Sequence, residues 1–155
     1  MMQAVIMAGG KGTRLAALTK DEIPKPMVPV AGKPLLLWQV ERLKENGITD
    51  IIMVIGHLGD KIREYFGDGE KFGVSIRYFE ETEPLGTAGY FYYLKDMIHG
   101  DRFVMMSGDL FFDIDFQRMI HFHEEKGAVA TLFVHPNGHP FDSDLLVLDH
   151  DDKIT

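Results

Sequence analysis

Three short, largely apolar runs constrain the fold of this chain more than any other feature of its sequence. They cover residues 3–8, 51–55 and 102–106, and each is followed, directly or after a loop, by a helical pattern. A continuous apolar run of this length is typical of a strand buried on both faces of a parallel sheet. Because parallel neighbours need a crossover connection, the order of these segments predicts βαβ units.

The remaining segments extend the same alternation. We expect helices over residues 34–46, 60–66, 86–98 and 115–126, and further strands over 74–79, 128–134 and 145–148. The fold class is therefore α/β, a Rossmann-like three-layer sandwich with a mostly parallel central sheet. The length of 155 residues fits one domain over residues 1–155. A turn at 149–153 followed by only two residues of a partner strand leaves an unpaired edge, so we expect a domain truncated at its C-terminal side.

Charge and composition exclude several classes of function. The net charge is -8, yet residues 1–34 carry +3 and the remainder -11. A glycine-rich cationic segment on an acidic body predicts a local anion site, whereas general nucleic-acid binding needs a basic face. The chain has no cysteine, which excludes disulfides and thiolate metal sites. It has no apolar run of roughly 18 residues and no signal-peptide pattern, so we expect a cytoplasmic protein without membrane or nucleic-acid partners.

A glycine-rich loop, Gly9 to Arg14, directly follows the first predicted strand. Glycines there let backbone N–H groups approach phosphates, and Lys11 and Arg14 add positive charge. The ATPase and GTPase phosphate loop requires Lys and Ser or Thr after its second glycine, which Thr13-Arg14 does not provide. The dinucleotide fingerprint fails as well, because its third glycine position holds Leu15 and no carboxylate closes the second strand.

The order and spacing of several motifs resemble the sugar-1-phosphate nucleotidylyltransferases. The matching segments are Gly9–Leu15, Leu18-Thr19, Lys25-Pro26, Pro29–Pro34, Glu83–Gly89 and Gly108-Asp109. A further stretch, from His135 through His139-Pro140 to Asp144, resembles the guanylyltransferases for heptose or mannose 1-phosphate. The resemblance implies the nucleotidyltransferase fold and an enzyme that joins a sugar 1-phosphate to a nucleoside triphosphate, releasing pyrophosphate. It leaves the identity of the sugar open, and equally whether the chain forms a homo-oligomer.

This implied reaction requires cations rather than a general base. A phosphate monoester has a second pKa of about 6, so the attacking oxygen is already ionised near neutral pH. Catalysis then depends on positioning and on charge stabilisation. We expect Arg14 to hold the pyrophosphate leaving group with its planar fork, assisted by Lys11. The resemblance assigns Lys25 to the α-phosphate and the incoming sugar phosphate, and Asp109 to a Mg²⁺ ion.

The nucleotide base is expected between the first glycine loop and the segment that opens at Leu85. Glu81 or Glu80 could accept hydrogen bonds from the N1–H and N2–H₂ groups of guanine, which favours GTP over pyrimidine nucleotides. Ser107 occupies a position where the family often has Asn. The full set expected to bind the nucleotide is Ala8, Gly9, Gly10, Lys11, Gly12, Thr13, Glu81, Leu85, Gly86, Thr87 and Gly108.

Two other functions remain open at this point. One is a catalytically silent regulatory module that holds a nucleotide or a nucleotide-sugar without turnover. The other is a cytidylyltransferase for an amino-alcohol phosphate, which would use the same loop chemistry. Retention of Arg14, Lys25 and Asp109 together favours the enzyme that makes a nucleotide-sugar.

Overall fold

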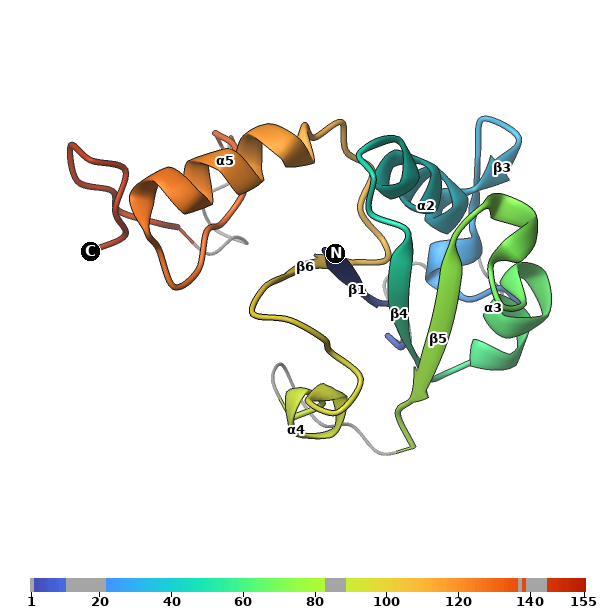
Figure 1. The fold of residues 1–155 in the computed structure, drawn as a ribbon. Coiled ribbons are helices and arrows are strands. Elements are labelled where there is room, and N and C mark those ends of the chain that lie inside the picture. The colour runs from blue at the N-terminus through green and yellow to red at the C-terminus, as the bar shows by residue number, and fades with distance from the viewer. Residues whose placement is uncertain (1, 11–21, 83–88, 137, 139–144) are drawn as a thin grey trace. The chain divides into compact units, whose positions relative to one another are not determined.

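The computed structural model describes residues 2–10, 22–82, 89–136, 138 and 145–155. These residues form two compact units, Met1–Phe116 and Gln117–Thr155, which are described separately below (Figure 1). Among the described residues, no helix combines the length and the apolar character that a bilayer span requires.

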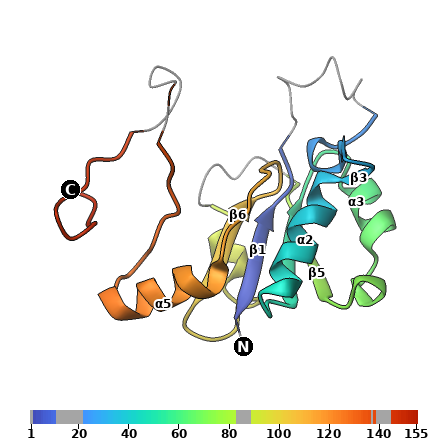
Figure 2. The same cartoon turned by 90° about the horizontal axis from the view of Figure 1, so that it is seen from above.

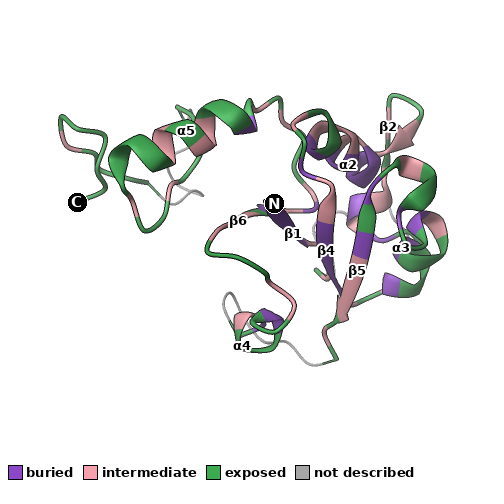
Figure 3. Ribbon diagram, in the orientation of Figure 1, coloured by how far each residue is buried: buried purple, intermediate pink, exposed green. Residues whose placement is uncertain are grey.

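The first unit is built on a four-stranded parallel sheet with the order β5-β4-β1-β6. Its strands are β1 (Gln3–Met7), β4 (Asp50–Ile55), β5 (Ser75–Glu80) and β6 (Phe103–Ser107). In register, Gln3 lies opposite both Asp50 and Phe103, and Asp50 lies opposite Ser75. The central strands β1 and β4 are almost entirely buried because their apolar runs are covered on both faces (Figure 3).

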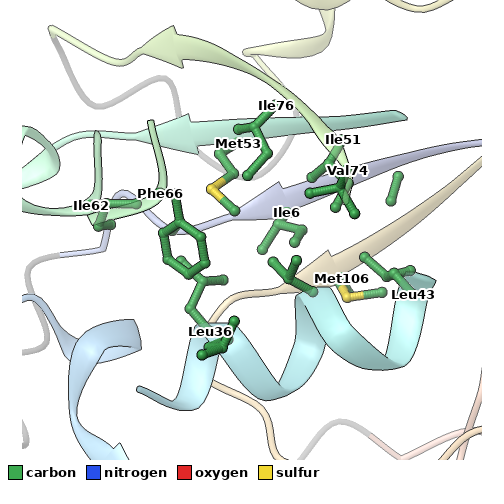
Figure 4. Close-up of a cluster of buried hydrophobic side chains, with 14 of the residues drawn as sticks. Ile6, Leu36, Leu43, Ile51, Met53, Ile62, Phe66, Val74, Ile76 and Met106 are labelled. Carbon is green, nitrogen blue, oxygen red and sulfur yellow. The ribbon is translucent and has the colours of Figure 1, made fainter. Parts of the chain in front are cut away.

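Helices cover both faces of this sheet. On one face, Ile6, Met53 and their alternate neighbours pack against α2 (Leu35–Glu45) and α3 (Gly59–Phe66) (Figures 2 and 4). On the opposite face, residues of the other parity pack against Tyr90 and Leu94 around α4 (Phe91–Leu94). Successive side chains of a strand point to opposite faces of the sheet, so a fully apolar strand contributes side chains to two separate hydrophobic cores. The predicted three-layer α/β sandwich with a parallel sheet is confirmed.

Short elements connect these layers. The segment before α2 contains a 3-10 turn, η2 (Lys25–Met27), and a small hairpin of β2 (Pro29–Val30) with β3 (Lys33–Pro34). A second 3-10 turn, η3 (Glu70–Phe72), precedes β5.

The helix expected over 86–98 is shorter in the structure. Residues 83–88 lie outside the described part of the chain, and the α-helix itself covers only Phe91–Leu94. Three consecutive aromatic residues at 91–93 lose side-chain freedom in a helix, which lowers their helix propensity. Packing of Tyr90 and Leu94 onto the sheet holds this single turn in place.

The second unit consists of most of α5 (Phe116–Lys126) and of extended segments, described apart from the first unit. The strands expected over 128–134 and 145–148 do not form within the described residues, where only an isolated antiparallel bridge joins Leu148 to Ile154. The turn between these two residues is present, since the N–H of Asp149 donates to the carbonyl of Lys153 over 2.9 Å. An apolar run becomes a strand only when a partner satisfies its backbone groups.

Candidate nucleotide site at the carboxyl edge of the sheet

Three of the four strands of the parallel sheet lead at their carboxyl ends into predicted site residues, and the fourth, β4, leads into a glycine. Ala8 and Gly9 follow β1, Gly56 follows β4, Glu81 follows β5, and Asp109 follows β6 with one glycine between them. From β1 the chain crosses to β4 and β5 on one side, and later returns to β6 on the other side of β1. Ligands of open α/β sheets bind at such a switch point, outside the carboxyl ends of the strands.

At this edge of the sheet, the backbones of the segments that follow β1, β4 and β6 contact one another directly, with no side chain between them. The N–H of Ala8 donates to Val54 O over 2.7 Å, and the N–H of Gly108 donates to Met7 O over 2.8 Å. A Cβ atom on Gly56 would lie 2.9 Å from Gly9 O, and one on Gly108 would lie 3.0 Å from Met7 O. Glycine is therefore required where the three loops approach one another.

A lysine and a carboxylate form the polar centre of the site. The Nζ of Lys25 donates to Oδ2 of Asp109, and the hydroxyl of Ser107 donates to Oδ1 of the same carboxylate. The side chains of Lys25 and Asp109 are 31% and 27% exposed, so both remain accessible to a ligand. Partial burial pushes the pKa of Asp109 upward, but the hydrogen bonds from Lys25 and Ser107 and the charge of Lys25 outweigh it and leave that pKa below its usual value.

Two prolines position Lys25. Pro24 precedes it with a φ of -61°, and Pro26, which is buried, follows it within η2. The turn is closed by a 2.7 Å hydrogen bond from the N–H of Met27 to Pro24 O. Since proline restricts both its own φ and the residue before it, this segment presents the lysine with little backbone freedom.

Glu81 extends from β5 toward the first loop. Its N–H donates to Ile55 O over 2.8 Å, and its Oε2 would lie 3.3 Å from a Cβ atom on Gly9. Burial, and after it the negative charge of Glu81, raise the pKa of the Tyr90 phenol. The neighbouring Glu80 instead forms an ion pair with Arg63 at 3.1 Å. Of the two glutamates considered for base recognition, Glu81 is therefore the one beside the glycine loop.

Several predicted site residues are not described by the structure. Gly9 and Gly10 of the first loop are described, and Gly10 is exposed. The remaining predicted residues of the two loops lie outside the described residues: Lys11, Gly12, Thr13, Arg14, Leu85, Gly86 and Thr87. Asp113, another acidic residue after β6, pairs with Arg42 at 2.7 Å, away from Lys25. Within the described ranges, no three Asp, Glu or His side chains cluster as a preformed metal site.

Sequence reasoning missed two polar side chains that support Asp109. The hydroxyl of Ser107 contacts the carboxylate directly, although the family's usual residue there is Asn. Gln39 donates to the carbonyl oxygens of Ser107 and Leu110 from a position that is 2% exposed. Its signal in the sequence is a polar residue placed between Leu36 and Leu43 on the apolar face of a predicted helix.

The strand order and the polar groups at its switch point are typical of α/β proteins that bind phosphorylated ligands at the carboxyl edge of the sheet. Residues 3–154 match the nucleotidyl transferase family, and the chain belongs to that family. The resemblance seen in the glycine-loop and lysine motifs is confirmed.

Curated relatives carry the names of sugar-1-phosphate nucleotidyltransferases. A D-glycero-alpha-D-manno-heptose 1-phosphate guanylyltransferase of Campylobacter jejuni is 43% identical over 83% of this chain and 57% of its own length. A UTP--glucose-1-phosphate uridylyltransferase of Synechocystis is 38% identical over 84% of this chain and 36% of its own length. The chain thus spans roughly a third to somewhat over half of the relatives it matches.

A solved structure shares the fold over the whole chain. HddC from Yersinia pseudotuberculosis, complexed with GMP-PN, is similar with a TM-score of 0.76 at 28% identity. The alignment covers 100% of this chain and 68% of HddC.

Proposed function

We propose that this chain is the nucleotide-binding portion of a sugar-1-phosphate nucleotidylyltransferase. In the reaction, an oxygen of the sugar phosphate forms a bond to the α-phosphorus of a nucleoside triphosphate. The bond from that phosphorus to the β-phosphate bridging oxygen breaks, and pyrophosphate leaves. The observation that carries the proposal is the Lys25–Asp109 pair at the switch point of the sheet, directly after Gly108, whose backbone lies against Met7 and Ala8.

The proposed chemistry divides the phosphates between Lys25 and the two cations of the glycine-rich loop. Lys25 contacts the α-phosphate and the incoming sugar phosphate, where two anions must approach each other. Arg14 holds the pyrophosphate through bidentate contacts, and Lys11 assists it. The backbone N–H groups of Gly9, Gly10, Gly12 and Thr13 cradle the phosphates, as glycine-rich turns do in other nucleotide sites.

Enzymes of this family generally use a divalent metal ion, and we propose that here it is Mg²⁺ held by Asp109. An ionised carboxylate with a lowered pKa is a suitable hard oxygen ligand. Mg²⁺ commonly takes only one or two carboxylates and completes its shell with water and substrate phosphates. When bound, the ion would neutralise developing phosphate charge, and the Lys25 ammonium would be available to the substrates instead of to Asp109.

We propose GTP as the nucleotide, with its base beside Ala8, Gly9, Glu81 and the segment Leu85–Thr87. A carboxylate can accept two hydrogen bonds from the N1–H and N2–H₂ of guanine. Support comes from the position of the Glu81 Oε2 beside Gly9. The heptose 1-phosphate guanylyltransferase and the GMP-PN complex among the similar proteins agree with this choice, whereas the uridylyltransferase does not.

Pyrophosphate release by the intact protein with matched substrate pairs tests the function. GTP, UTP, dTTP, CTP and ATP would each be combined with mannose, heptose and glucose 1-phosphates and with phosphocholine. The proposal expects the highest turnover with GTP and a sugar 1-phosphate. Turnover only with CTP and phosphocholine would establish the cytidylyltransferase, and nucleotide binding without any turnover would establish the regulatory module.

Replacement of Lys25 by Ala should lower turnover by roughly 100-fold or more, because a positioned cation stabilises charge at the reacting phosphorus. Arg77→Ala is the matched control. Arg77 also pairs with an aspartate, Asp50, and their side chains are 34% and 27% exposed, but Asp50 begins β4 at the amino end of the sheet. Equal turnover in both variants would contradict the role of Lys25, provided that both retain the circular dichroism spectrum of the wild type.

A further inference from the structure

A single buried amide holds the turn that carries Asp109. Gln39 lies on the inner face of α2, and its Nε2 donates to Ser107 O at 3.0 Å and to Leu110 O at 2.6 Å. These two carbonyls flank Asp109 on either side along the chain. Both N–H groups of the Gln39 amide are therefore used in hydrogen bonds that fix the backbone on either side of Asp109, the proposed metal ligand.

The amide of Gln39 is only partly satisfied, so its hydrogen bonds to the turn come with a cost. The Oε1 of Gln39 is buried and makes no hydrogen bond to any described residue. An unpaired buried acceptor costs free energy that an apolar side chain of the same size would avoid. The amide cannot be reversed to relieve it, since two carbonyl oxygens face the Nε2. In return, the amide satisfies the carbonyl oxygens of Ser107 and Leu110 and fixes the geometry of the turn that carries Asp109.

Helix α2 also contacts the chain farther along, and so gives Gln39 a rigid base. Arg42 pairs with Asp113 at 2.7 Å, and the Oδ1 of Asn46, just after the helix, accepts a hydrogen bond from the N–H of Phe116. At its start, the N–H of Leu35 donates to Val28 O, three residues after Lys25. The helix is thus joined to the segment with the lysine and to the segment with the carboxylate.

We propose that Gln39 is a positioning residue that holds Asp109 within reach of Lys25 and of the phosphates. The inference rests on the proposed function for its catalytic consequence, but not for its structural one. Gln39 itself touches no substrate in this assignment and acts only through the turn at 107–110.

The structural consequence is tested by amide hydrogen exchange. In Gln39→Met, a replacement of similar size without donors, exchange at residues 108–111 should accelerate by at least about tenfold, because two hydrogen bonds that close the turn are lost. Gln3→Met is the matched control. Gln3 is also buried and donates to Asp50, but at the amino end of the same sheet, so its replacement should leave exchange at 108–111 unchanged.

The catalytic consequence is tested by a double-mutant cycle in the intact enzyme. Gln39→Met should lower kcat by roughly 10- to 100-fold, since a small displacement of a positioned group has an effect of this size. In an Asp109→Asn background the same change should lower kcat by less than about twofold, because its effect passes through the carboxylate. Gln3→Met should leave kcat within about twofold of the wild type.

The outcomes separate the two proposals. Unchanged exchange at 108–111 in Gln39→Met, or an equal kcat loss with and without the Asp109 carboxylate, would overturn the role of Gln39. If Gln39→Met fails to fold, Gln39→Leu, which also lacks donors and carries no charge, takes its place. Failure of both variants to fold, while Gln3→Met folds, would make Gln39 a purely structural residue. Absence of any turnover in the wild type would contradict the proposed function and leave the exchange result to decide the inference.

Discussion

At the scale of residues, the site depends on close approach between groups that are distant in the sequence. Lys25 and Asp109 are 84 positions apart, and the fold brings them into direct contact. The sequence resemblance assigned a role to each residue, but spacing alone could not predict that they pair. The glycines were predictable as a phosphate-binding loop, whereas the contact between Gly9 and Gly56 follows only from strand order.

Gly56→Ala should destabilise the protein by about 1–3 kcal/mol, because its Cβ would meet a backbone oxygen that cannot move without shifting the glycine loop. The obstructing atom is Gly9 O at 2.9 Å. Urea unfolding measures the change in the free energy of unfolding.

Gly10→Ala is the control for this substitution, since nothing lies within 4 Å of the added methyl group. Its free energy of unfolding should stay within about 0.5 kcal/mol of the wild type, or rise slightly. Similar losses in the two variants would show that the contact with Gly9 does not restrict position 56.

At the scale of elements, hydrophobic periodicity predicted the strands correctly where the folded chain provides a neighbouring strand to pair with. The strands β1, β4 and β6 begin and end within one residue of their apolar runs. The runs of β1 and β4 are buried because the sheet is covered on both faces. The run of β6 is only partly buried and Met105 is exposed, because β6 lies at the edge of the described sheet. The run at 128–134 is equally apolar, but no strand forms there in the described residues, and Val129 and Phe133 are exposed. Strand formation requires a partner, and a one-dimensional pattern cannot specify one.

The contact between β5 and the end of α3 makes stability depend on pH. The hydroxyl of Tyr78 donates to Gly67 O over 2.6 Å, and burial raises its pKa to about 12. In the unfolded chain the phenol has the ordinary tyrosine pKa of 10.0. The stabilisation from the neutral phenol is therefore complete below pH 10 and is lost as the pH rises from 10 toward 12.

Tyr78→Phe removes this titrating group. The variant should be less stable than the wild type at pH 8, and the difference in the free energy of unfolding should shrink above pH 10. Urea unfolding at several pH values between 8 and 11.5 measures it. A difference that stays constant over this range would show that the phenol is not held neutral by the fold.

At the scale of the whole molecule, the described chain combines a well-packed unit with one whose apolar residues are largely exposed. Unit Met1–Phe116 contains every residue of the two hydrophobic cores among the described positions. In Gln117–Thr155, a hollow of about 1010 Å³ is lined by apolar residues such as Val129, Leu132 and Leu146. Thermodynamic stability should therefore depend on the first unit.

Ile6→Ala should destabilise the protein by about 2–5 kcal/mol, because Ile6 is fully buried between the sheet and α2 and its loss leaves a cavity (Figure 4). Val129→Ala removes an apolar side chain that is fully exposed and should change the free energy of unfolding by at most about 0.5 kcal/mol. Denaturant unfolding followed by Trp38 fluorescence compares them. Equal losses in the free energy of unfolding for the two variants would contradict the conclusion that stability depends on the first unit.

Hydrophobic periodicity by itself determined the α/β class and the parallel sheet, because buried runs require apolar residues at particular spacings. The family was indicated by the resemblance of the ordered motifs to the sugar-1-phosphate nucleotidylyltransferases. The tertiary structure alone decided that Glu81 rather than Glu80 lies beside Gly9, that Lys25 meets Asp109, and that Gln39 donates to the turn that carries Asp109. Each of these contacts joins segments from different strands or helices, and only the order and packing of those elements bring them together.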